Sequence, residues 1–350
     1  MKPGVIKIVI VESSPGRCRF LAGLFSTQPG LEVAGSAGSC DEALDVIAKL
    51  RPDVVTMGHK PPALDGLEAT RRIMERCPVP IVIVRDTGSA GEVASTFDAV
   101  NAGALAVMPR PAENDADQAP VRELVQTVRL MSEVKVIRRW PRRAQAAGPQ
   151  LPAPLPSHER RPGLRIVAIG ASTGGPLALA TLLGGLPRDF PAPVVVVQHM
   201  AAGFTRGFVD WLAPSSALPV HVATDGERLY PGHVYMAPDD THMKVTRDDR
   251  VALVDTLPEN GLRPSVACLF RSVAQVYGGD AAGVLLTGMG KDGAAELRLL
   301  KDHGAMTFAQ DEESSIVHGM PGEAIRLEAA MHVLPPDRIA AALKKAVGRR

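Results

Sequence analysis

Aromatic side chains are scarce in this chain of 350 residues, and neither sign of charge predominates. Phe, Trp and Tyr make up 4% of the residues, and 39 Lys and Arg against 38 Asp and Glu leave a formal net charge of +1. Few rings leave few platforms for stacked bases, and a nearly neutral chain has no overall attraction to nucleic acid or to an anionic bilayer. We therefore expect no nucleic-acid partner.

Cysteine is also rare and is not arranged for metal binding or crosslinking. The four cysteines lie far apart, with no C-x-x-C pair: Cys18, Cys40, Cys77 and Cys268. Such spacing fits neither a disulfide scaffold nor a zinc site, and it suits a reducing compartment. Scattered thiols in the core are the expected outcome.

Long hydrophobic runs are missing as well. No apolar stretch approaches the roughly 20 residues of a membrane span. The first apolar run, in MKPGVIKIVIVESS, is interrupted by Glu12 and lacks a cleavage pattern, so it predicts a buried strand rather than a signal peptide. We expect a cytoplasmic protein without membrane insertion.

The first part of the chain alternates short Val/Ile-rich runs with helical patterns. A helix over residues 40–50 is predicted because Ala43, Leu44, Ile47 and Leu50 share one face. Five strands in this rhythm predict a parallel α/β sheet. The expected strands are Lys7–Val11, Leu31–Ser36, Asp53–Met57, Pro80–Val84 and Ala104–Met108.

A change of composition divides the chain. Residues 139–163 are rich in Pro, Ala and Arg and lack apolar periodicity, which is typical of a semi-rigid linker. We therefore expect one domain over residues 1–138 and a second over residues 164–350.

The second domain repeats the α/β alternation on a larger scale. Its buried strands are expected at Arg165–Ile169, Pro193–Gln198, Gly283–Thr287 and Met306–Ala309. Shorter strands and a hairpin are expected at the edge of its sheet, at His221–Ala223, His233–Ala237, His242–Val245 and Arg250–Val254. The pattern predicts a doubly wound, mostly parallel sheet with an edge hairpin.

The segment RIVAIGASTGGP contains a G-x-S-x-G turn between a strand and a helix. Such a turn exposes the Ser172 hydroxyl above the sheet and directs backbone N–H groups toward a developing oxyanion. A structural glycine turn or a phosphate-binding loop remains an alternative. A dinucleotide site is less favoured, because Ser172 stands where that motif needs its second glycine.

Two further residues complete a possible triad. His199 directly follows the strand PVVVVQ, and Asp292 follows a buried strand and the loop TGMGKDG. Active sites of open α/β sheets collect at the carboxyl ends of strands, and an Asp can fix the tautomer of a histidine base. By itself, Asp292 would be read as a helix N-cap, but the combination favours a Ser–His–Asp hydrolase. The chain order Ser, His, Asp differs from that of ordinary α/β-hydrolases.

Several segments closely resemble the chemotaxis protein-glutamate methylesterases of the CheB family. They are IGASTGGP, VVQHM, LYPGHVYMAPDDTHM, RPSVACLFRSVA, LLTGMGKDGAAEL and FAQDEESSIVHGMPGEAI. The resemblance covers about residues 165–349, and the N-terminal half is similar to that family's receiver domain, a flavodoxin-like fold. It implies hydrolysis of glutamate methyl esters on methyl-accepting chemoreceptors, releasing methanol, with glutamine deamidation as a related activity.

By position, the resemblance implies specific roles for five residues. Ser172 would be the nucleophile, His199 the general base and then acid, and Asp292 the orienting carboxylate. The backbone around Thr173 and Met289 would line the site and donate to the oxyanion. No metal or other cofactor is needed. The implied partners are the receptors and, as a second candidate, a chemotaxis histidine kinase.

The receiver half departs from its family at the phosphorylation site. Gly58 stands where the phosphoaccepting aspartate is expected, and Glu12-Ser13 replaces the acidic pair. Arg85 replaces the Ser/Thr, and Arg110 replaces the Lys. Neither Asp53 nor Asp65 is well placed to substitute. One carboxylate is also poor ligation for Mg²⁺, so we expect a pseudo-receiver that takes no phosphate.

Three other functions remain open from the sequence. A degenerate receiver raises the alternative of a catalytically silent signalling adaptor, although the triad is intact. A serine esterase with another substrate is the second alternative, because fold and triad set the reaction class only. A transcriptional regulator is the third, but the chain lacks a small basic output domain.

Overall fold

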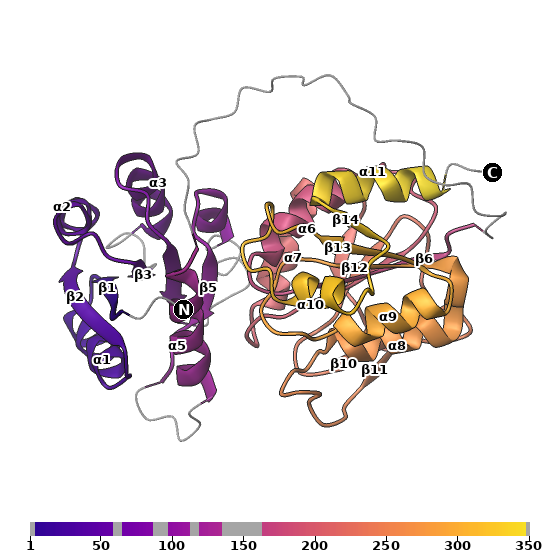
Figure 1. Cartoon of the computed structure of the whole chain (residues 1–350), viewed down its shortest axis with the longest axis horizontal. Coiled ribbons are helices and arrows are strands. Elements are labelled where there is room, and N and C mark those ends of the chain that lie inside the picture. Colours follow the sequence, from indigo (N-terminus) through magenta and orange to yellow (C-terminus); the bar gives the residue numbers. More distant parts are fainter. Residues whose placement is uncertain (1–3, 59–64, 87–96, 113–118, 135–162, 348–350) are drawn as a thin grey trace.

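The computed structural model describes residues 4–58, 65–86, 97–112, 119–134 and 163–347. They form two α/β units that lie side by side, one from each half of the chain (Figure 1). Apart from Gly163, the expected linker over residues 139–163 lies outside the described residues.

The N-terminal unit has the expected sheet of five parallel strands. Their order is β2-β1-β3-β4-β5, and every pairing is parallel. Apolar clusters cover both faces of the sheet, which explains why its central strands are almost entirely Val, Ile and Met. The elements are β1 (Ile6–Val11), α1 (Pro15–Ser26), β2 (Leu31–Ala37), α2 (Cys40–Leu50), β3 (Val54–Gly58), α3 (Gly66–Arg76), β4 (Ile81–Arg85), β5 (Ala106–Pro109) and α5 (Ala119–Met131).

Helix α2 shows how the local sequence sets its bounds. Ser39 caps it by accepting a hydrogen bond from the Glu42 N–H, and Ala43, Leu44 and Ile47 are buried against the sheet. The helix ends at Leu50, and its C-cap residue, Arg51, adopts a left-handed conformation with φ of 45°. The predicted helix over residues 40–50 is confirmed.

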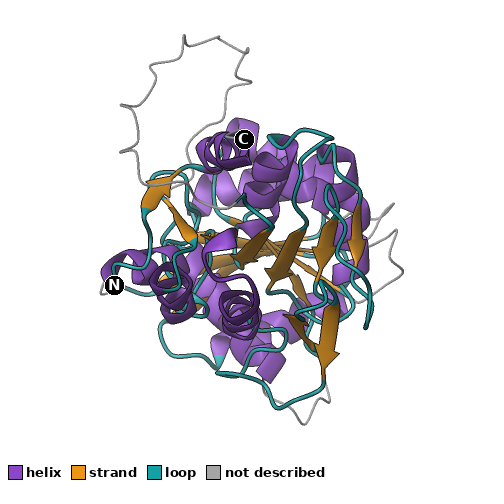
Figure 2. Cartoon of the chain, turned by 90° about the vertical axis from the view of Figure 1, so that its right-hand side faces the viewer, coloured by secondary structure: helices purple, strands orange, loops and turns teal. Residues whose placement is uncertain are grey.

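The C-terminal unit is built around seven strands, all parallel. Their order is β14-β13-β12-β6-β7-β9-β8, with helices on both faces (Figure 2). Its strands are β6 (Ile166–Ala171), β7 (Val194–Gln198), β8 (Val220–Val222), β9 (Val234–Met236), β12 (Ala281–Leu285), β13 (Met306–Gln310) and β14 (His332–Leu334). Its helices are α6 (Gly175–Gly184), α7 (Thr205–Leu212), α8 (Val266–Tyr277), α9 (Ala294–Asp302), α10 (Met320–Arg326) and α11 (Pro336–Val347), with short 3₁₀ turns at Ala213–Ser215 and Gly278–Asp280.

The hairpin differs from the prediction in its placement. Strands β10 (His242–Val245) and β11 (Val251–Val254) pair antiparallel, but they form a separate two-stranded sheet instead of joining the edge of the main one. Met243 and Val245 pack in one apolar cluster with α8, and the Ser272 hydroxyl of α8 receives the Val245 N–H. The hairpin therefore covers a helix, while β8 occupies the sheet edge.

The two units touch through apolar side chains. Phe97 of the N-terminal unit is 3% exposed, and its ring centroid lies 5.2 Å from that of Phe208 and 5.7 Å from that of Trp211 on α7. In return, Ile316 and Val317 of the C-terminal unit pack against the apolar cluster under α5. These contacts fix which side of the second sheet the first unit faces.

None of the helices in the described residues has the length and apolar character needed to cross a membrane.

Candidate active site

Two neighbouring strand ends bring Ser172 and His199 together. Strands β6 and β7 pair in parallel so that Ala171 lies opposite Gln198, and each candidate residue directly follows the end of its strand. The His199 N–H donates to the Ala171 carbonyl over 2.9 Å. The carboxyl edge of the sheet therefore sets Ser172 beside His199, as the sequence predicted.

The turn at Ser172 is held by backbone hydrogen bonds. The Ser172 N–H donates to the Thr287 carbonyl (3.0 Å), and the Gly175 N–H donates to the Ser172 carbonyl (2.8 Å). Gly174 has a positive φ of 79°, which would strain a residue with a side chain, whereas Ser172 does not have a positive φ. A Cβ at Gly174 would also lie 2.6 Å from Ile316 Cβ, so glycine is required there for two reasons.

Asp292 lies against His199, with 2.9 Å between Asp292 Oδ2 and His199 Nε2. The carboxylate also accepts hydrogen bonds from the Val266 N–H (2.7 Å), the Ala267 N–H (3.1 Å) and the Ser265 hydroxyl (3.1 Å). All three donors belong to the N-terminus of α8, where the helix dipole favours negative charge. Asp292 is not the N-cap of its own helix, since that position of α9 belongs to Gly293.

These contacts decide the charge state of Asp292. The residue is 5% exposed, and this burial alone would raise the pKa of its carboxyl group. The hydrogen bonds from His199, Val266 and Ala267 together outweigh burial and hold the pKa below its usual range. Asp292 is thus a buried anion next to the imidazole.

The orientation of the His199 ring assigns its two nitrogens. Because Nε2 faces Asp292, Nδ1 is the nitrogen left for a second partner. Among the described residues, no hydrogen bond joins Ser172 Oγ to the imidazole or to any other group. Loose serine–histidine geometry is common in enzymes without substrate, since these bonds tighten in the complex.

Two backbone N–H groups are available near the nucleophile. Within the described part of the chain, neither the Thr173 nor the Met289 N–H has a hydrogen-bond acceptor. The loop that carries Met289 lies close to the nucleophile turn. A Cβ at Gly288 would lie only 2.6 Å from Ser172 Cβ and 2.5 Å from the Met320 sulfur. Free donors in this position suit a developing oxyanion.

Sequence reasoning missed two buried polar residues that hold the turn. Gln198 is 6% exposed, and its amide NH₂ donates to the carbonyls of Ser172 and His199. Thr287 is 1% exposed, and its hydroxyl donates to the Thr173 carbonyl. The available signal was a polar residue at the end of an otherwise apolar strand pattern.

In the N-terminal unit, the carboxylate of Glu12 occupies the space beside Gly58. Glu12 is 4% exposed, and its Oε2 lies 2.6 Å from where a Cβ on Gly58 would be. Arg110 Nη2 donates to the same oxygen over 3.3 Å. Burial lowers the pKa of Arg110, although the charges of Asp86 and Glu12 oppose this effect.

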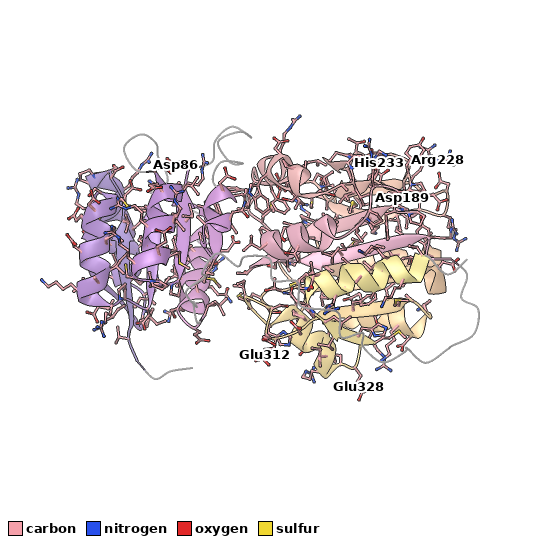
Figure 3. The ribbon with its side chains drawn as sticks, turned by 90° about the horizontal axis from the view of Figure 1, so that it is seen from above. Asp86, Asp189, Arg228, His233, Glu312 and Glu328 are labelled. Carbon is pink, nitrogen blue, oxygen red and sulfur yellow. The ribbon has the colours of Figure 1, made fainter. Side chains whose placement is uncertain are left out.

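The other acids and cations near this position have their own partners. Asp65 caps α3 by accepting the Leu67 N–H, and Asp53 accepts the Lys7 N–H. Asp86, which Figure 3 labels on the N-terminal unit, forms an ion pair with Arg17 over 2.5 Å. Arg85 is buried at the end of β4.

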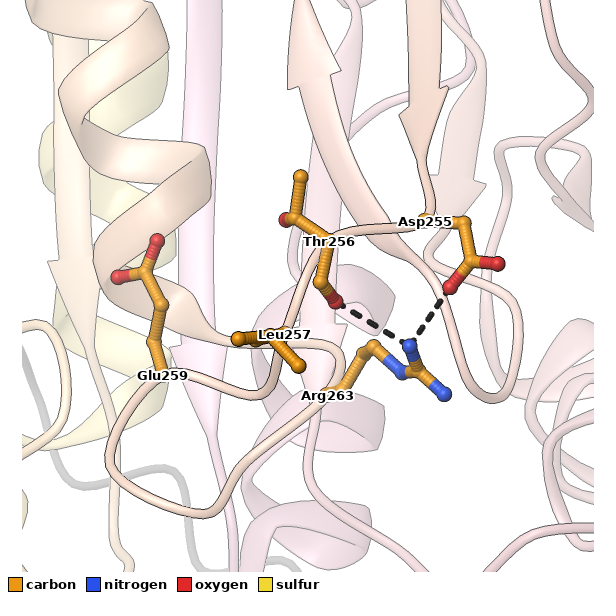
Figure 4. A pocket seen from close by; sticks show the side chains of 5 residues that line it. All are labelled: Asp255, Thr256, Leu257, Glu259 and Arg263. Carbon is orange, nitrogen blue, oxygen red and sulfur yellow. Dashed lines mark hydrogen bonds and ion pairs between the residues drawn. The ribbon is translucent and has the colours of Figure 1, made fainter.

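Among the described residues, no group of three or more His, Cys, Asp or Glu side chains is arranged to hold a metal ion. One hollow lies in the segment between β11 and α8, where Arg263 donates to Asp255 (2.6 Å) and to the Thr256 carbonyl (3.1 Å) (Figure 4). Its charged lining side chains are engaged in ion pairs, Arg263 with Asp255 and Glu259 with Arg271, and its lining includes neither Ser172 nor His199. We therefore place the chemistry at the strand ends.

Comparisons with known proteins give matches for both units of the chain. Residues 167–343 match the family model described as CheB methylesterase, and residues 8–119 match that of the response regulator receiver domain. The chain is 56% identical to protein-glutamate methylesterase/protein-glutamine glutaminase 4 of Geobacter metallireducens, over 97% of this chain and 98% of the relative. It is 52% identical to the protein-glutamate methylesterase/protein-glutamine glutaminase of Nitrosospira multiformis, over 99% and 98%.

A solved structure points the same way for the C-terminal unit. The CheB methylesterase catalytic domain of Thermotoga maritima is 40% identical and superimposes with a TM-score of 0.51, covering 53% of this chain and 98% of that domain. Together with the match of both family models in order, these likenesses confirm the fold class and the resemblance noted in the sequence. The chain belongs to the CheB methylesterase family, with a receiver unit preceding the methylesterase unit.

Proposed function

We propose that this protein hydrolyses glutamate methyl esters on methyl-accepting chemoreceptors to glutamate and methanol, and that it also deamidates receptor glutamines. The observation that carries the proposal is the His199–Asp292 hydrogen bond beside Ser172 at one edge of the sheet. The names of the relatives, which pair methylesterase with glutaminase, support the substrate class.

The geometry supports an acyl-transfer mechanism. Ser172 Oγ attacks the ester carbonyl while its proton passes to His199 Nδ1, since Nε2 is engaged by Asp292. The N–H groups of Thr173 and Met289 stabilise the oxyanion of the tetrahedral intermediate. His199 then protonates the departing methoxide, which leaves as methanol, and Ser172 is left as a glutamyl ester.

Water completes the cycle. His199 takes a proton from water, whose oxygen attacks the glutamyl ester, and it returns that proton to Ser172 Oγ as the carboxylate is released. With a glutamine side chain, the same sequence releases ammonia in place of methanol. Asp292, whose pKa is held low by its hydrogen bond with His199 and by the first N–H groups of α8, stabilises the imidazolium formed in each half-reaction.

We propose that the receiver unit takes no phosphate. Gly58 supplies no nucleophile, and the carboxylate of Glu12, paired with Arg110, fills the space beside it. The domain boundaries that we propose remain residues 1–138 and 164–350, joined by a linker over 139–163. Control then rests on contacts between the receiver unit, its partners and the methylesterase unit.

The receiver unit stands close to the candidate site. The pKa of the Glu123 carboxyl group on α5 is raised by desolvation, an effect that the nearby His199 partly opposes. Ile316 and Val317, which contact the receiver unit, belong to a loop bonded to Thr287 and through it to the nucleophile turn. We propose that the receiver unit restricts the approach of large substrates.

The decisive test is methanol release from methylated chemoreceptor membranes, with no phosphodonor present. We expect release by the wild type and a loss of several orders of magnitude with Ser172→Ala. No methanol release from a folded wild type, with no hydrolysis of small soluble esters either, would favour the silent adaptor. Hydrolysis of small soluble esters, but of methylated receptors by neither the wild type nor Phe97→Ala, in which the contact between the units is weakened, would favour an esterase with another substrate.

Where the protein acts and with whom are part of the same proposal. We place it in the cytoplasm, with receptors as substrates and a chemotaxis histidine kinase as a candidate partner. Co-purification of the full chain with a kinase–receptor array tests the second point. If the chain bound receptors but not the kinase, its substrates would be its only partners in this array.

A further inference from the structure

Gln198 joins the nucleophile turn to the strand of the histidine. It is the last residue of β7, and its Nε2 donates to the Ser172 carbonyl and the His199 carbonyl, both over 2.8 Å. The side chain is almost fully buried, so these bonds are shielded from water. One amide group therefore holds the main chain of both residues.

We propose that Gln198 is a positioning residue that orients the Ser172–Thr173 peptide and thereby aims the Thr173 N–H at the oxyanion. The inference rests on the proposed function, in which that N–H is a donor. A trans peptide is planar, and its C=O and N–H point in opposite directions. Fixing the Ser172 carbonyl therefore fixes the direction of the Thr173 N–H.

The carbonyl is held from two sides. Gln198 Nε2 and the Gly175 N–H both donate to Ser172 O over 2.8 Å. Two donors leave little freedom for the peptide plane to rotate, and they polarise the peptide so that its N–H becomes a better donor. Preorganised donors of this kind need no rearrangement when charge develops on the substrate.

The surroundings of Gln198 are shaped for this orientation. A Cβ at position 175 would overlap Gln198 Oε1 and lie 2.9 Å from Gln198 Cδ. Only glycine at position 175 therefore leaves room for the Gln198 side chain. Within the described residues, the buried Oε1 has no hydrogen-bond partner, which is unfavourable. If the Gln198 amide were turned by 180°, Oε1 would face the carbonyl oxygens of Ser172 and His199, which repel it. The two hydrogen bonds of the NH₂ group therefore decide the orientation of the amide.

The first experiment replaces Gln198 by methionine, which keeps the length and volume but removes the donor. For methyl-ester hydrolysis we expect kcat to fall about 10- to 100-fold with little change in KM, as for a misdirected oxyanion donor. A fluorophosphonate probe should label Ser172 more slowly by a similar factor, because phosphonylation also places negative charge in that site. Gln198→Glu, which keeps the shape but replaces the donor by an acceptor, should also be slow.

A buried hydroxyl far from the turn supplies the control. Thr307 of β13 is 0% exposed and donates to the Ala329 carbonyl. Thr307→Val should lower the melting temperature while leaving kcat and the labelling rate near those of the wild type. This separates a general loss of stability from a loss of alignment.

A second experiment uses the contact with Gly175. Gly175→Ala should displace the Gln198 side chain and slow labelling of Ser172. Adding Gly175→Ala to Gln198→Ala should cost little more than Gln198→Ala alone, because the displaced group is already absent. If the double variant were slowed by the product of the two single-variant factors, the two substitutions would act independently and the proposal would be contradicted.

The outcomes are distinguishable from those of the proposed function. Wild-type labelling at Ser172 without methanol release would overturn the substrate, while the Gln198 variants would still be compared by labelling rate. Unchanged kcat and labelling in folded Gln198→Met, or a change in KM alone, would overturn the role of Gln198. A wild type that is not labelled would overturn the assignment of Ser172 and this inference with it.

Discussion

At the scale of single residues, Asp292 combines two tasks that are usually separate. It orients His199 and it receives the first N–H groups of α8. A carboxylate can accept all these bonds at once, whereas an amide cannot. Replacing it therefore affects both the chemistry and the packing of a helix.

The lowered pKa of the Asp292 carboxyl group predicts how the stability lost on replacing Asp292 depends on pH. A folded pKa below the unfolded value contributes stability that is present above the unfolded pKa of about 3.9 and is lost as pH falls through the folded pKa. Urea unfolding from pH 3 to 7 should show that Asp292→Asn is destabilised at neutral pH and that the gap to wild type narrows in acid. A gap of equal size at both ends of this range would contradict the prediction.

The pairing of Glu12 with Gly58 predicts that one substitution does not restore phosphorylation. In Gly58→Asp, the new Cβ would lie 2.6 Å from Glu12 Oε2, so the side chains compete for one space. With a small-molecule phosphodonor and Mg²⁺, neither the wild type nor Gly58→Asp should give a phosphoprotein, as measured by intact mass. Phosphoprotein from the wild type would refute the assignment of a pseudo-receiver.

At the scale of elements, the site depends on a helix that contributes no triad residue. Helix α8 begins at Val266 and places its N-terminal groups under Asp292. Its cap, Ser265, accepts the Cys268 N–H and donates to Asp292 Oδ1. The helix terminus and the carboxylate thus stabilise each other.

Comparing two caps separates these effects. Ser265→Ala should cost about 1 kcal/mol in the unfolding free energy of its unit, as is usual for a lost N-cap, and should also reduce kcat. Ser39→Ala removes the cap of α2 in the receiver unit and should cost a similar amount without altering kcat on a small ester. Equal kcat in both variants would show that Ser265 serves the helix alone.

The sequence predicted the strands that carry the site residues more accurately than it predicted the contacts among those residues. Buried parallel strands are visible as Val/Ile runs, so the positions of Ser172 and His199 after β6 and β7 followed directly. The acceptor of the Ser172 N–H is the backbone carbonyl of Thr287, far along the chain, and the side chain at position 287 does not indicate which N–H that carbonyl accepts. The hairpin was misplaced because apolar alternation shows that one face is buried, but not whether a sheet or a helix covers it.

At the scale of the whole molecule, the two units are joined by a small aromatic contact. The ring of Phe97 packs against the stacked rings of Phe208 and Trp211, and the rise in the pKa of Glu123 on α5 that desolvation causes is partly opposed by the nearby His199. Contacts between domains of this kind commonly permit relative motion. Such motion would let the receiver unit restrict large substrates, as proposed above, in one arrangement and admit them in another.

Weakening this contact should relieve the obstruction. Phe97→Ala removes a large buried side chain and should raise methanol release from receptor membranes, while hydrolysis of a small soluble ester changes little. Phe97→Leu retains much of the apolar contact, so its rate of methanol release should lie between those of Phe97→Ala and the wild type. A fall in receptor hydrolysis would indicate that the contact supports activity.

The distribution of the site along the chain also has a consequence for biosynthesis. A ribosome that has just added His199 has made the nucleophile and its base, but neither the Thr287 carbonyl that receives the Ser172 N–H nor the Asp292 carboxylate. By the time those groups emerge, the receiver unit has long been translated. A newly made chain therefore completes the proposed site only when the receiver unit is already present, so the proposed restraint precedes any hydrolysis.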